Sequence, residues 1–276
     1  MIEWADYPVG DHRVMCPSCG RKPNDRTMGV TVAGEEHGVA HCFRCGYVET
    51  RHRKRDVTPA EQRAFKRRMD ALRRQHDAEQ HQRKAEAAAA ASMRWIAASS
   101  AEEHPYLTAK GVRAHGLRVE ARRDLLIPMR DIEGRLHSLQ SIAPDGFKLF
   151  MPNGRVKGCY HAIGRPTGSI VICEGYATGA TIHEDAGTAV AVAFNAGNLV
   201  PVAKALRLKF PCISIVIAAD DDWKTDGNPG LTAATEAARV VGGTLAVPKF
   251  DELSRGDKDT DFNDLAKLSR AQELIT

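Results

Sequence analysis

Four of the seven cysteines in this 276-residue chain form two closely spaced pairs. The pairs are Cys16-Pro-Ser-Cys19 and Cys42-Phe-Arg-Cys45, and 22 residues separate them. A glycine follows each pair and lets the backbone amides turn back toward the sulfurs. Four thiolates suit a tetrahedral Zn²⁺ ion and leave no coordination position open, so we expect a structural site. Iron is the alternative ion, because cysteine ligands alone do not separate the two.

A second group of chemically active residues consists of carboxylates that follow apolar runs. Glu174 ends the run 169–173, and three aspartates follow the run 213–219. If both runs are parallel strands, their carboxyl ends lie along one edge of a sheet, where ligands bind. We expect Asp220 and Asp222 to face the same side as Glu174.

Carboxylates brought this close repel one another unless a cation lies between them. Mg²⁺ prefers such oxygens and bridges to phosphates, and Mn²⁺ is the alternative ion. The acidic segment 258–264 could add another oxygen donor. A site of this kind supports phosphoryl or nucleotidyl transfer.

The elements that must position these carboxylates have the pattern of an α/β domain. Four short and nearly continuous apolar runs are predicted strands, at 169–173, 188–194, 213–219 and 244–247. Helical stretches lie between them, at 178–185, 199–209 and 230–241. Apolar strands that alternate with helices indicate a parallel sheet covered on both faces.

Residues 51–103 form a separate stretch that contains no glycine. Thr58 and Pro59 are the N-cap and first residue expected at a helix start. Residues 51–84 hold 12 Lys/Arg against 5 Asp/Glu, although the whole chain has a net charge of only +4. We therefore expect a basic, solvent-exposed helical connector, and we favour a nucleic acid as its partner.

Membrane and helicase functions find no support in the sequence. The first residues lack the apolar run of a signal peptide, and no stretch approaches the roughly 18 apolar residues of a membrane span. We therefore expect a cytoplasmic protein. The chain also lacks a G-x4-GK[ST] phosphate loop, so we expect any helicase to be a separate protein.

Together, these motifs resemble the TOPRIM superfamily of primases, type IA and type II topoisomerases and some nucleases. Its signature is a Glu-Gly after one strand and a DxD after a later one, which Glu174-Gly175 and Asp220/Asp222 match. A TOPRIM domain after a four-cysteine zinc ribbon is similar to phage or plasmid members of the bacterial-type DNA primase family. The segments 104–107, 126–130 and 145–148 are similar to the N-terminal subdomain of mobile-element primases.

The resemblance implies an α/β fold in four parts. These are a small β zinc ribbon (1–50), a basic helical connector (51–103), a primase-type α+β N-terminal subdomain (104–167) and a catalytic TOPRIM domain with a Rossmann-like parallel sheet (168–276).

Roles for individual residues also follow from the resemblance. Glu174, Asp220 and Asp222 would bind Mg²⁺, and Asp261 would assist. Lys148 and Lys157 match basic positions that help to hold nucleotide or template. Two departures stand out: Thr178 lies where cellular primases tend to have an acidic residue, and the metal ligands are all cysteine, whereas cellular primases commonly use three cysteines and one histidine.

The implied function is that of a DNA primase, a DNA-directed RNA polymerase acting in phage or plasmid replication. It would make short RNA primers from ribonucleoside triphosphates on a single-stranded DNA template, beside a separate replicative helicase. The alternatives are a metal-dependent TOPRIM nuclease and a non-catalytic zinc-ribbon DNA-binding regulator. A topoisomerase would need a nucleophilic tyrosine in a large additional domain, which the sequence does not contain.

Overall fold

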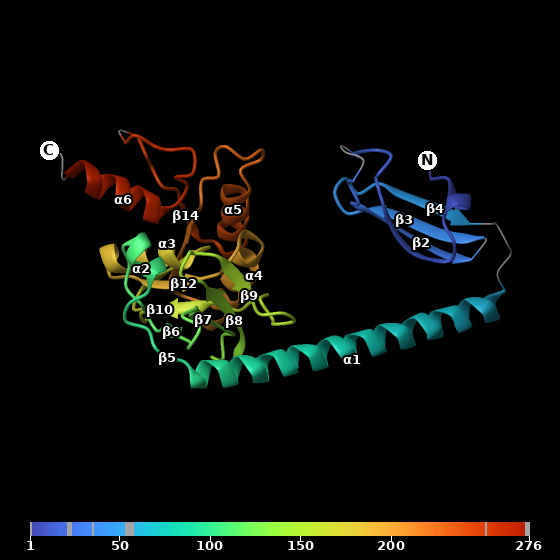
Figure 1. Ribbon diagram of the computed structural model, residues 1–276, viewed down its shortest axis with the longest axis horizontal. Coiled ribbons are helices and arrows are strands. Elements are labelled where there is room, and N and C mark those ends of the chain that lie inside the picture. Colours follow the sequence, from blue (N-terminus) through green and yellow to red (C-terminus); the bar gives the residue numbers. More distant parts are fainter. Residues whose placement is uncertain (1, 21–23, 35, 53–57, 252, 274–276) are drawn as a thin grey trace. The chain divides into compact units, whose positions relative to one another are not determined.

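The computed structural model describes residues 2–20, 24–34, 36–52, 58–251 and 253–273. The chain divides into two compact units, Met1–Arg73 and Arg74–Thr276, each of which is described by itself (Figure 1). Residues 53–57, at the start of the predicted connector, lie outside the described residues.

The first unit is a four-stranded antiparallel sheet whose strands pair in chain order. A short 3₁₀ turn, η1 (Trp4–Asp6), precedes β1 (Gly10–Val14), β2 (Met28–Gly34), β3 (His37–Cys42) and β4 (Val48–His52). Burial alternates along β3, as expected for a sheet with one covered face. Among the described residues, seven buried side chains make up the core, and Cys16 and Cys42 are two of them. So small a core needs a cross-link or a metal for stability.

The 39-residue helix α1 (Pro59–Ala97) follows. It starts with the predicted cap: the Glu61 amide donates to Thr58 Oγ1 at 3.3 Å, and the Thr58 amide donates to Glu61 Oε2 at 2.9 Å. This reciprocal capping box satisfies two amides that would otherwise lack partners. In the second unit, the end of the helix packs Ala91 against Leu126 of the following sheet.

An antiparallel sheet of five strands comes next, again in chain order. Its strands are β5 (Ser99–Ser100), β6 (Arg118–Val119), β7 (Leu125–Arg130), β8 (Leu136–Ile142) and β9 (Lys148–Phe150), with α2 (Pro105–Lys110) between β5 and β6. Helix α2 ends at Gly111, whose φ of 66° lies in the left-handed region where glycine is favoured.

The last sheet has the strand order β10-β12-β11-β13-β14, and all neighbours are parallel except the edge strand β10. The strands are β10 (His161–Ile163), β11 (Ser169–Cys173), β12 (Ala189–Val192), β13 (Ser214–Ala218) and β14 (Thr244–Ala246). The helices are α3 (Tyr176–Ala186), α4 (Ala196–Lys209), α5 (Pro229–Val241) and α6 (Phe262–Glu273).

Helices cover both faces of this sheet (Figure 1). Successive residues of β11 point to opposite sides: Val171 and Cys173 join the core that contains α3, while Ile170 and Ile172 join the core that contains α4 and α5. Burial on both sides explains why the strands are continuous apolar runs in the sequence.

The predicted fold class is therefore confirmed, since a parallel α/β sheet and a four-cysteine unit are both present. Sequence analysis predicted neither the antiparallel strand β10 nor the helix α6. The predicted division into four parts stays a prediction. Among the described residues, no helix has the length and apolar character needed to cross a membrane.

Candidate active site and metal centre

The predicted carboxylates lie at the ends of two adjacent strands. Strands β11 and β13 pair in parallel, with Ile172 opposite Ile217, so both chains leave the sheet at the same edge. Glu174 follows β11 directly, and Asp220 follows β13 after one further residue. Strands β11 and β13 are distant in the sequence, and their pairing therefore brings these acidic residues to the same edge of the sheet.

Glu174 and Asp220 each have a buried oxygen, Oε1 and Oδ1 respectively, without a hydrogen-bond partner among the described residues. Burial, reinforced by the charge of Asp222, raises the pKa of Glu174 to about 7. Burial and the neighbouring charges of Glu174 and Asp261 raise the pKa of Asp220 to about 8. Buried, unpartnered and mutually repelling carboxylates are the environment that a divalent cation stabilises.

Asp222 is held in place by the start of helix α5. The Gly230 amide donates to Asp222 Oδ2 at 3.0 Å, and the Asp222 amide donates to Asn228 Oδ1 at 2.9 Å. A side chain at Gly230 could not be accommodated, because its Cβ would lie 2.6 Å from the Asp220 carbonyl oxygen. The helix start therefore orients Asp222 beside Asp220.

Asp221 points to a different partner. Its Oδ2 accepts a 2.8 Å bond from Arg255 Nη1, and its Oδ1 accepts a 2.7 Å bond from Asn228 Nδ2. The Arg255 guanidinium lies between two aromatic rings, 4.9 Å from the centroid of Trp223 and 4.3 Å from that of Phe250. Sequence analysis did not predict a role for Arg255. This residue lies in the loop between β14 and α6, and its contacts depend on the path of that loop, which no local motif indicates.

Asp261 starts helix α6. Its Oδ1 accepts bonds from the amides of Asn263 and Asp264, at 2.8 and 2.9 Å, and Thr178 Oγ1 donates to its Oδ2 at 2.8 Å. Asp261 is also close enough to Asp220 to raise the pKa of that residue. It therefore combines a capping role with a position beside the carboxylates. Asp259, by contrast, accepts from the Gly256 amide within its own turn.

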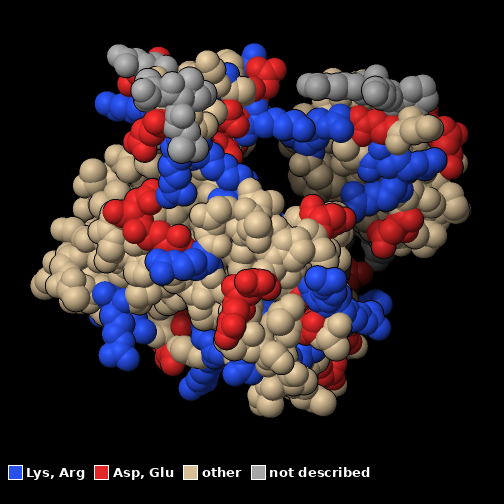
Figure 2. Space-filling model, turned by 60° about the vertical axis from the view of Figure 1, so that its left-hand side comes forward, with Lys and Arg blue, Asp and Glu red and all other residues tan. Residues whose placement is uncertain are grey.

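The two predicted lysines differ in their surroundings. Lys148 lies on β9, and its Nζ is 5.5 Å from the ring centroid of Tyr106. Burial and the charge of Lys110 lower the pKa of Lys148, while the charges of Asp261 and Asp220 act in the opposite direction. Lys157 is exposed in the loop before β10. Figure 2 shows acidic and basic side chains intermixed on the visible face, without a single large patch of either sign.

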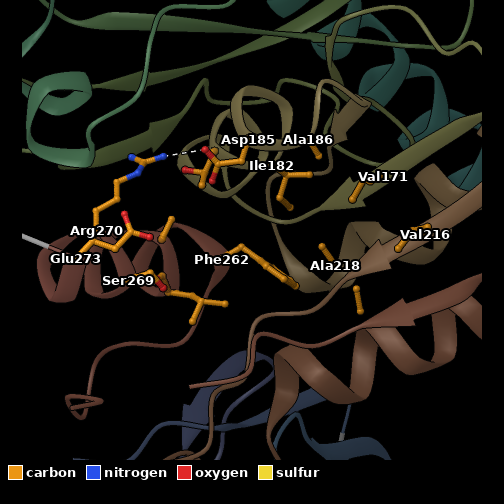
Figure 3. A pocket seen from close by; sticks show the side chains of 14 residues that line it. Val171, Ile182, Asp185, Ala186, Val216, Ala218, Phe262, Ser269, Arg270 and Glu273 are labelled. Carbon is orange, nitrogen blue, oxygen red and sulfur yellow. Dashed lines mark hydrogen bonds and ion pairs between the residues drawn. The ribbon is translucent and has the colours of Figure 1, made fainter. Parts of the chain in front are cut away.

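A cavity of about 550 Å³ lies between α3, α6 and the sheet. Apolar side chains such as Val216 and Phe262 line it, and an ion pair of 2.8 Å between Arg270 and Asp185 lies at its side (Figure 3). Among the described residues, none of the predicted catalytic side chains lines this cavity.

The four predicted cysteines converge on one point in the first unit. Their sulfurs all lie within 4.8 Å of one another, with 3.7 Å between Cys16 and Cys45 and 3.6 Å between Cys19 and Cys42. Tetrahedral ligands about 2.3 Å from a central ion are about 3.8 Å apart, so the cluster has the size of a metal site.

All seven cysteines are free thiols. Each knuckle is closed by a backbone bond, from the Gly20 amide to the Cys16 carbonyl and from the Gly46 amide to the Cys42 carbonyl. The Ser18 amide donates to the Cys16 sulfur at 3.4 Å. Among the described residues, these cysteines are the one group of three or more candidate ligands that converges so tightly. The carboxylate oxygens do not converge as tightly as the sulfurs. This spacing is compatible with Mg²⁺, because the ion keeps several water ligands.

Comparison with known proteins agrees with this geometry. Residues 169–271 match the family model of the Toprim domain. The chain is 42% identical over 160 residues to the DNA primase TraC of Escherichia coli, covering 54% of this chain and 15% of that protein. A second DNA primase TraC of Escherichia coli is 41% identical over 157 residues, covering 53% of this chain and 11% of that protein.

One solved structure with similarity to this chain is the primase fragment of the bacteriophage T7 primase-helicase protein. Its TM-score is 0.45 at 15% identity, and the match covers 97% of this chain and 98% of that fragment.

The second unit therefore contains the residues that match the Toprim domain, and a four-cysteine cluster of metal-binding geometry precedes them in the sequence. Over more than half of its length, the chain is similar to DNA primases named TraC. The matched region is a small part of those relatives' own length.

Proposed function

We propose that the chain is a DNA primase that synthesises short RNA primers on single-stranded DNA from ribonucleoside triphosphates. The observation that carries this proposal is the pair of buried, unpartnered oxygens of Glu174 and Asp220 at adjacent strand ends. The sequence similarity of the chain to DNA primases TraC, over slightly more than half of its length, supports the same reaction. The setting would be phage or plasmid replication in a bacterial cytoplasm, with a separate helicase as partner.

Glu174, Asp220 and Asp222 would hold Mg²⁺, with Asp261 beside them. A divalent ion bound there supplies positive charge where negative charge builds up during nucleotidyl transfer. In that reaction, the primer 3′-oxygen bonds to the α-phosphorus as the bond to pyrophosphate breaks and its electron pair leaves with pyrophosphate. The protein contributes by orienting its carboxylates, which the α5 and α6 helix starts hold in place. Lys148 and Lys157 would hold nucleotide or template.

In the first unit, Cys16, Cys19, Cys42 and Cys45 would hold a structural Zn²⁺ ion. The adjacent sheet surface has groups suited to an unpaired template base. Phe43 is 65% exposed, the Arg13 guanidinium lies 4.6 Å from its ring centroid, and His41 contacts its edge. Single-stranded nucleic acids stack their bases on aromatic rings of this kind. The four parts predicted from the sequence would then be a template-binding ribbon, a connector, a primase subdomain and a catalytic domain.

The test offers purified protein single-stranded templates, four ribonucleotides and Mg²⁺, and sizes the products. Asp220→Asn and Asp222→Asn should each reduce primer synthesis about 100-fold or more while leaving template binding nearly intact. Asp257→Asn is the matched control, because it removes the same charge from a side chain that is 80% exposed. Loss of end-labelled template would reveal a nuclease, and template binding without any Mg²⁺-dependent chemistry would reveal a regulator. Either result would overturn the proposal.

A further inference from the structure

Strands β8 and β9 present a glutamine and a phenylalanine on one face of the antiparallel sheet. Alternate residues of a strand point to opposite sides. Leu139 packs against the end of α1, whereas Ile142 joins the core that contains α3. Gln140 therefore lies on the same face as Ile142. Its cross-strand partner on β9 is Phe150, so the two side chains are neighbours on that face.

The Phe150 ring contacts Phe194, a residue that lies beside the predicted metal ligands. The two ring centroids are 6.3 Å apart in an edge-to-face arrangement. Phe194 follows β12 after one residue, and its amide donates to the Glu174 carbonyl at 2.7 Å. Its φ of 75° is uncommon for a bulky residue, and such conformations cluster at functional sites. Direct contacts thus link Phe150 to the strand end that carries Glu174.

Phe150 keeps part of its side chain open to solvent despite this contact. The residue is 38% exposed, whereas Phe194 is 9% exposed. An aromatic ring that stays accessible beside the acidic strand ends can receive a planar ligand on its face. Nucleobases stack on rings of this kind whatever their identity, because every base has a π face.

Gln140 adds a polar group that can recognise the edge of a base. It is 6% exposed, and no hydrogen bond to its side-chain amide occurs within the described part of the chain. Buried amides generally have a partner, so a ligand here would complete hydrogen bonds that are otherwise unmade. A glutamine amide offers one acceptor oxygen and two donor hydrogens, which match the donors and acceptors on a base edge.

A fixed amide suits a base of the template better than a base of the incoming ribonucleotide. The incoming ribonucleotide differs from one step to the next and is chosen by base pairing, so a side chain that favoured one base there would oppose this choice. An unpaired template base has a free edge and a free face. Both are needed to contact an amide and a ring at once.

We propose that Phe150 stacks on an unpaired base of single-stranded template DNA and that Gln140 forms hydrogen bonds with the edge of the same base. The template would thereby be held beside the strand end that carries Glu174. The role in priming rests on the proposed primase function. The affinity for a base in single-stranded DNA does not, so the two ideas can fail separately.

The experiment measures the affinity of the full-length protein for short single-stranded oligodeoxynucleotides by fluorescence anisotropy, without ribonucleotides. An abasic site is moved along the oligonucleotide one position at a time. At one position, the missing base should weaken binding to the wild type about tenfold, as expected for the loss of one stacked base. Phe150→Leu should bind the intact oligonucleotide about tenfold more weakly. It should also be insensitive to an abasic site at that position, because the two changes remove the same contact.

Three further variants separate stacking from base recognition. Phe150→Trp keeps an aromatic face and should retain most of the affinity. Phe147→Ala should bind like the wild type. It is the matched control, because it removes a phenylalanine that is 62% exposed from the same hairpin, three positions before Phe150. Gln140→Leu keeps the size of the side chain and should abolish any difference in affinity between oligonucleotides that differ only in the base at the mapped position. Melting temperatures verify that each variant is folded.

Primer synthesis forms the second arm. In Phe150→Leu, the template concentration for half-maximal synthesis should rise about tenfold, while the KM for ribonucleotides stays unchanged. Equal oligonucleotide affinities of the wild type and Phe150→Leu would overturn the inference, as would a raised KM for ribonucleotides at unchanged template affinity. If Phe150→Leu loses affinity and abasic sensitivity but the wild-type protein makes no primer, the base contact stands and the primase proposal fails.

Discussion

Thr178 Oγ1 donates a 2.8 Å hydrogen bond to Asp261 Oδ2, across 83 residues of sequence. The bond joins the first turn of α3 to the start of α6, and thereby fixes a carboxylate that influences Asp220. The sequence comparison identified Thr178 as a departure from cellular primases, which tend to have an acidic residue at this position. Here a neutral donor at this position binds an acidic residue that comes from elsewhere in the chain.

Replacing Thr178 with valine should destabilise the second unit by about 2 kcal/mol, because a buried hydrogen bond to a charged group is lost. In a domain of this size, that corresponds to a melting temperature lower by roughly 4–8 °C. Thr178→Ser keeps the hydroxyl and should lose less. Differential scanning calorimetry would compare the melting temperatures of the wild type and the two variants. A valine variant that melts like the wild type would show that the Thr178–Asp261 bond contributes little to stability.

Asp261 has two roles that substitutions can separate. Asparagine is as good an N-cap as aspartate and can still pair with Thr178, so Asp261→Asn should melt close to the wild type. Asp261→Ala loses both the cap and the acceptor of the Thr178 bond, and should lose about 3 kcal/mol of stability. Both variants lack the charge beside Asp220, so both should need more Mg²⁺ for half-maximal primer synthesis. A Mg²⁺ titration of Asp261→Asn that superimposes on the wild type would mean that Asp261 is a helix cap alone.

Arg255 is expected to position the carboxylate loop without touching substrate. Its Nη1 bonds to Asp221 Oδ2, and its Nε donates to the Asp259 carbonyl at 2.8 Å, so it links two acidic segments. Arg255→Ala should cost about 3 kcal/mol, because the largely buried Asp221 would lose its charged partner. Arg255→Lys keeps the charge but not the planar group that lies between the rings, and should be intermediate.

Mg²⁺ binding distinguishes positioning by Arg255 from a purely structural role. Trp223 contacts Arg255 and follows Asp222 directly, so its fluorescence can follow a Mg²⁺ titration. We expect weaker Mg²⁺ binding in Arg255→Ala at a temperature where the variant is fully folded, with partial rescue in Arg255→Lys. Equal Mg²⁺ affinities in all three proteins would limit Arg255 to a stabilising role.

Much of the second unit could be predicted because its strands are buried on both faces. Runs such as 169–173 and 213–219 are apolar throughout, so their limits in the structure differ from the predicted ones by at most one residue. Strand β10 was missed because three residues are too few to establish a period. Helix α6 was missed because the acidic cluster at its start was interpreted only as a group of ligands.

The acidic side of the site was also accessible from sequence, since Glu174 and the aspartates that begin at Asp220 follow predicted strands. The contacts between α2 and α6 were not. Asn263 Nδ2 donates to the Lys110 carbonyl and Lys267 Nζ donates to the Ala109 carbonyl, although these partners are more than 150 positions apart in the sequence. Arg255 escaped notice for the same reason, because its partners depend on the path of a loop. Contacts between residues that are far apart in the sequence and belong to no spacing motif cannot be recognised from the local sequence.

The four-cysteine cluster should be required for folding of the first unit alone. The described part of its core has seven buried residues, so removal of the metal by a chelator, or Cys16→Ser, should abolish the first unit's cooperative unfolding transition. The transition of the second unit should not change. Cys212→Ser is the control, because Cys212 is an exposed thiol outside the cluster. Mass spectrometry under native conditions should find one ion that the Cys16→Ser protein lacks, and a Cys16→Ser protein that keeps this ion and stays folded would contradict the assignment.

The carboxylate pair should make Mg²⁺ binding strongly dependent on pH. In the metal-free protein, the pKa values of Glu174 and Asp220 are raised to about 7 and about 8. Because the folded state then binds more protons than the unfolded state, its stability should fall as the pH rises from about 4 to about 8. Mg²⁺ competes with these protons, so it should raise the melting temperature little near about pH 6 and much more near about pH 8.5. In the Glu174→Gln, Asp220→Asn double variant, which cannot titrate at these positions, the effect of Mg²⁺ should be small at both pH values. A wild-type protein whose Mg²⁺-induced shift is the same at both would show that the two carboxylates do not bind the ion.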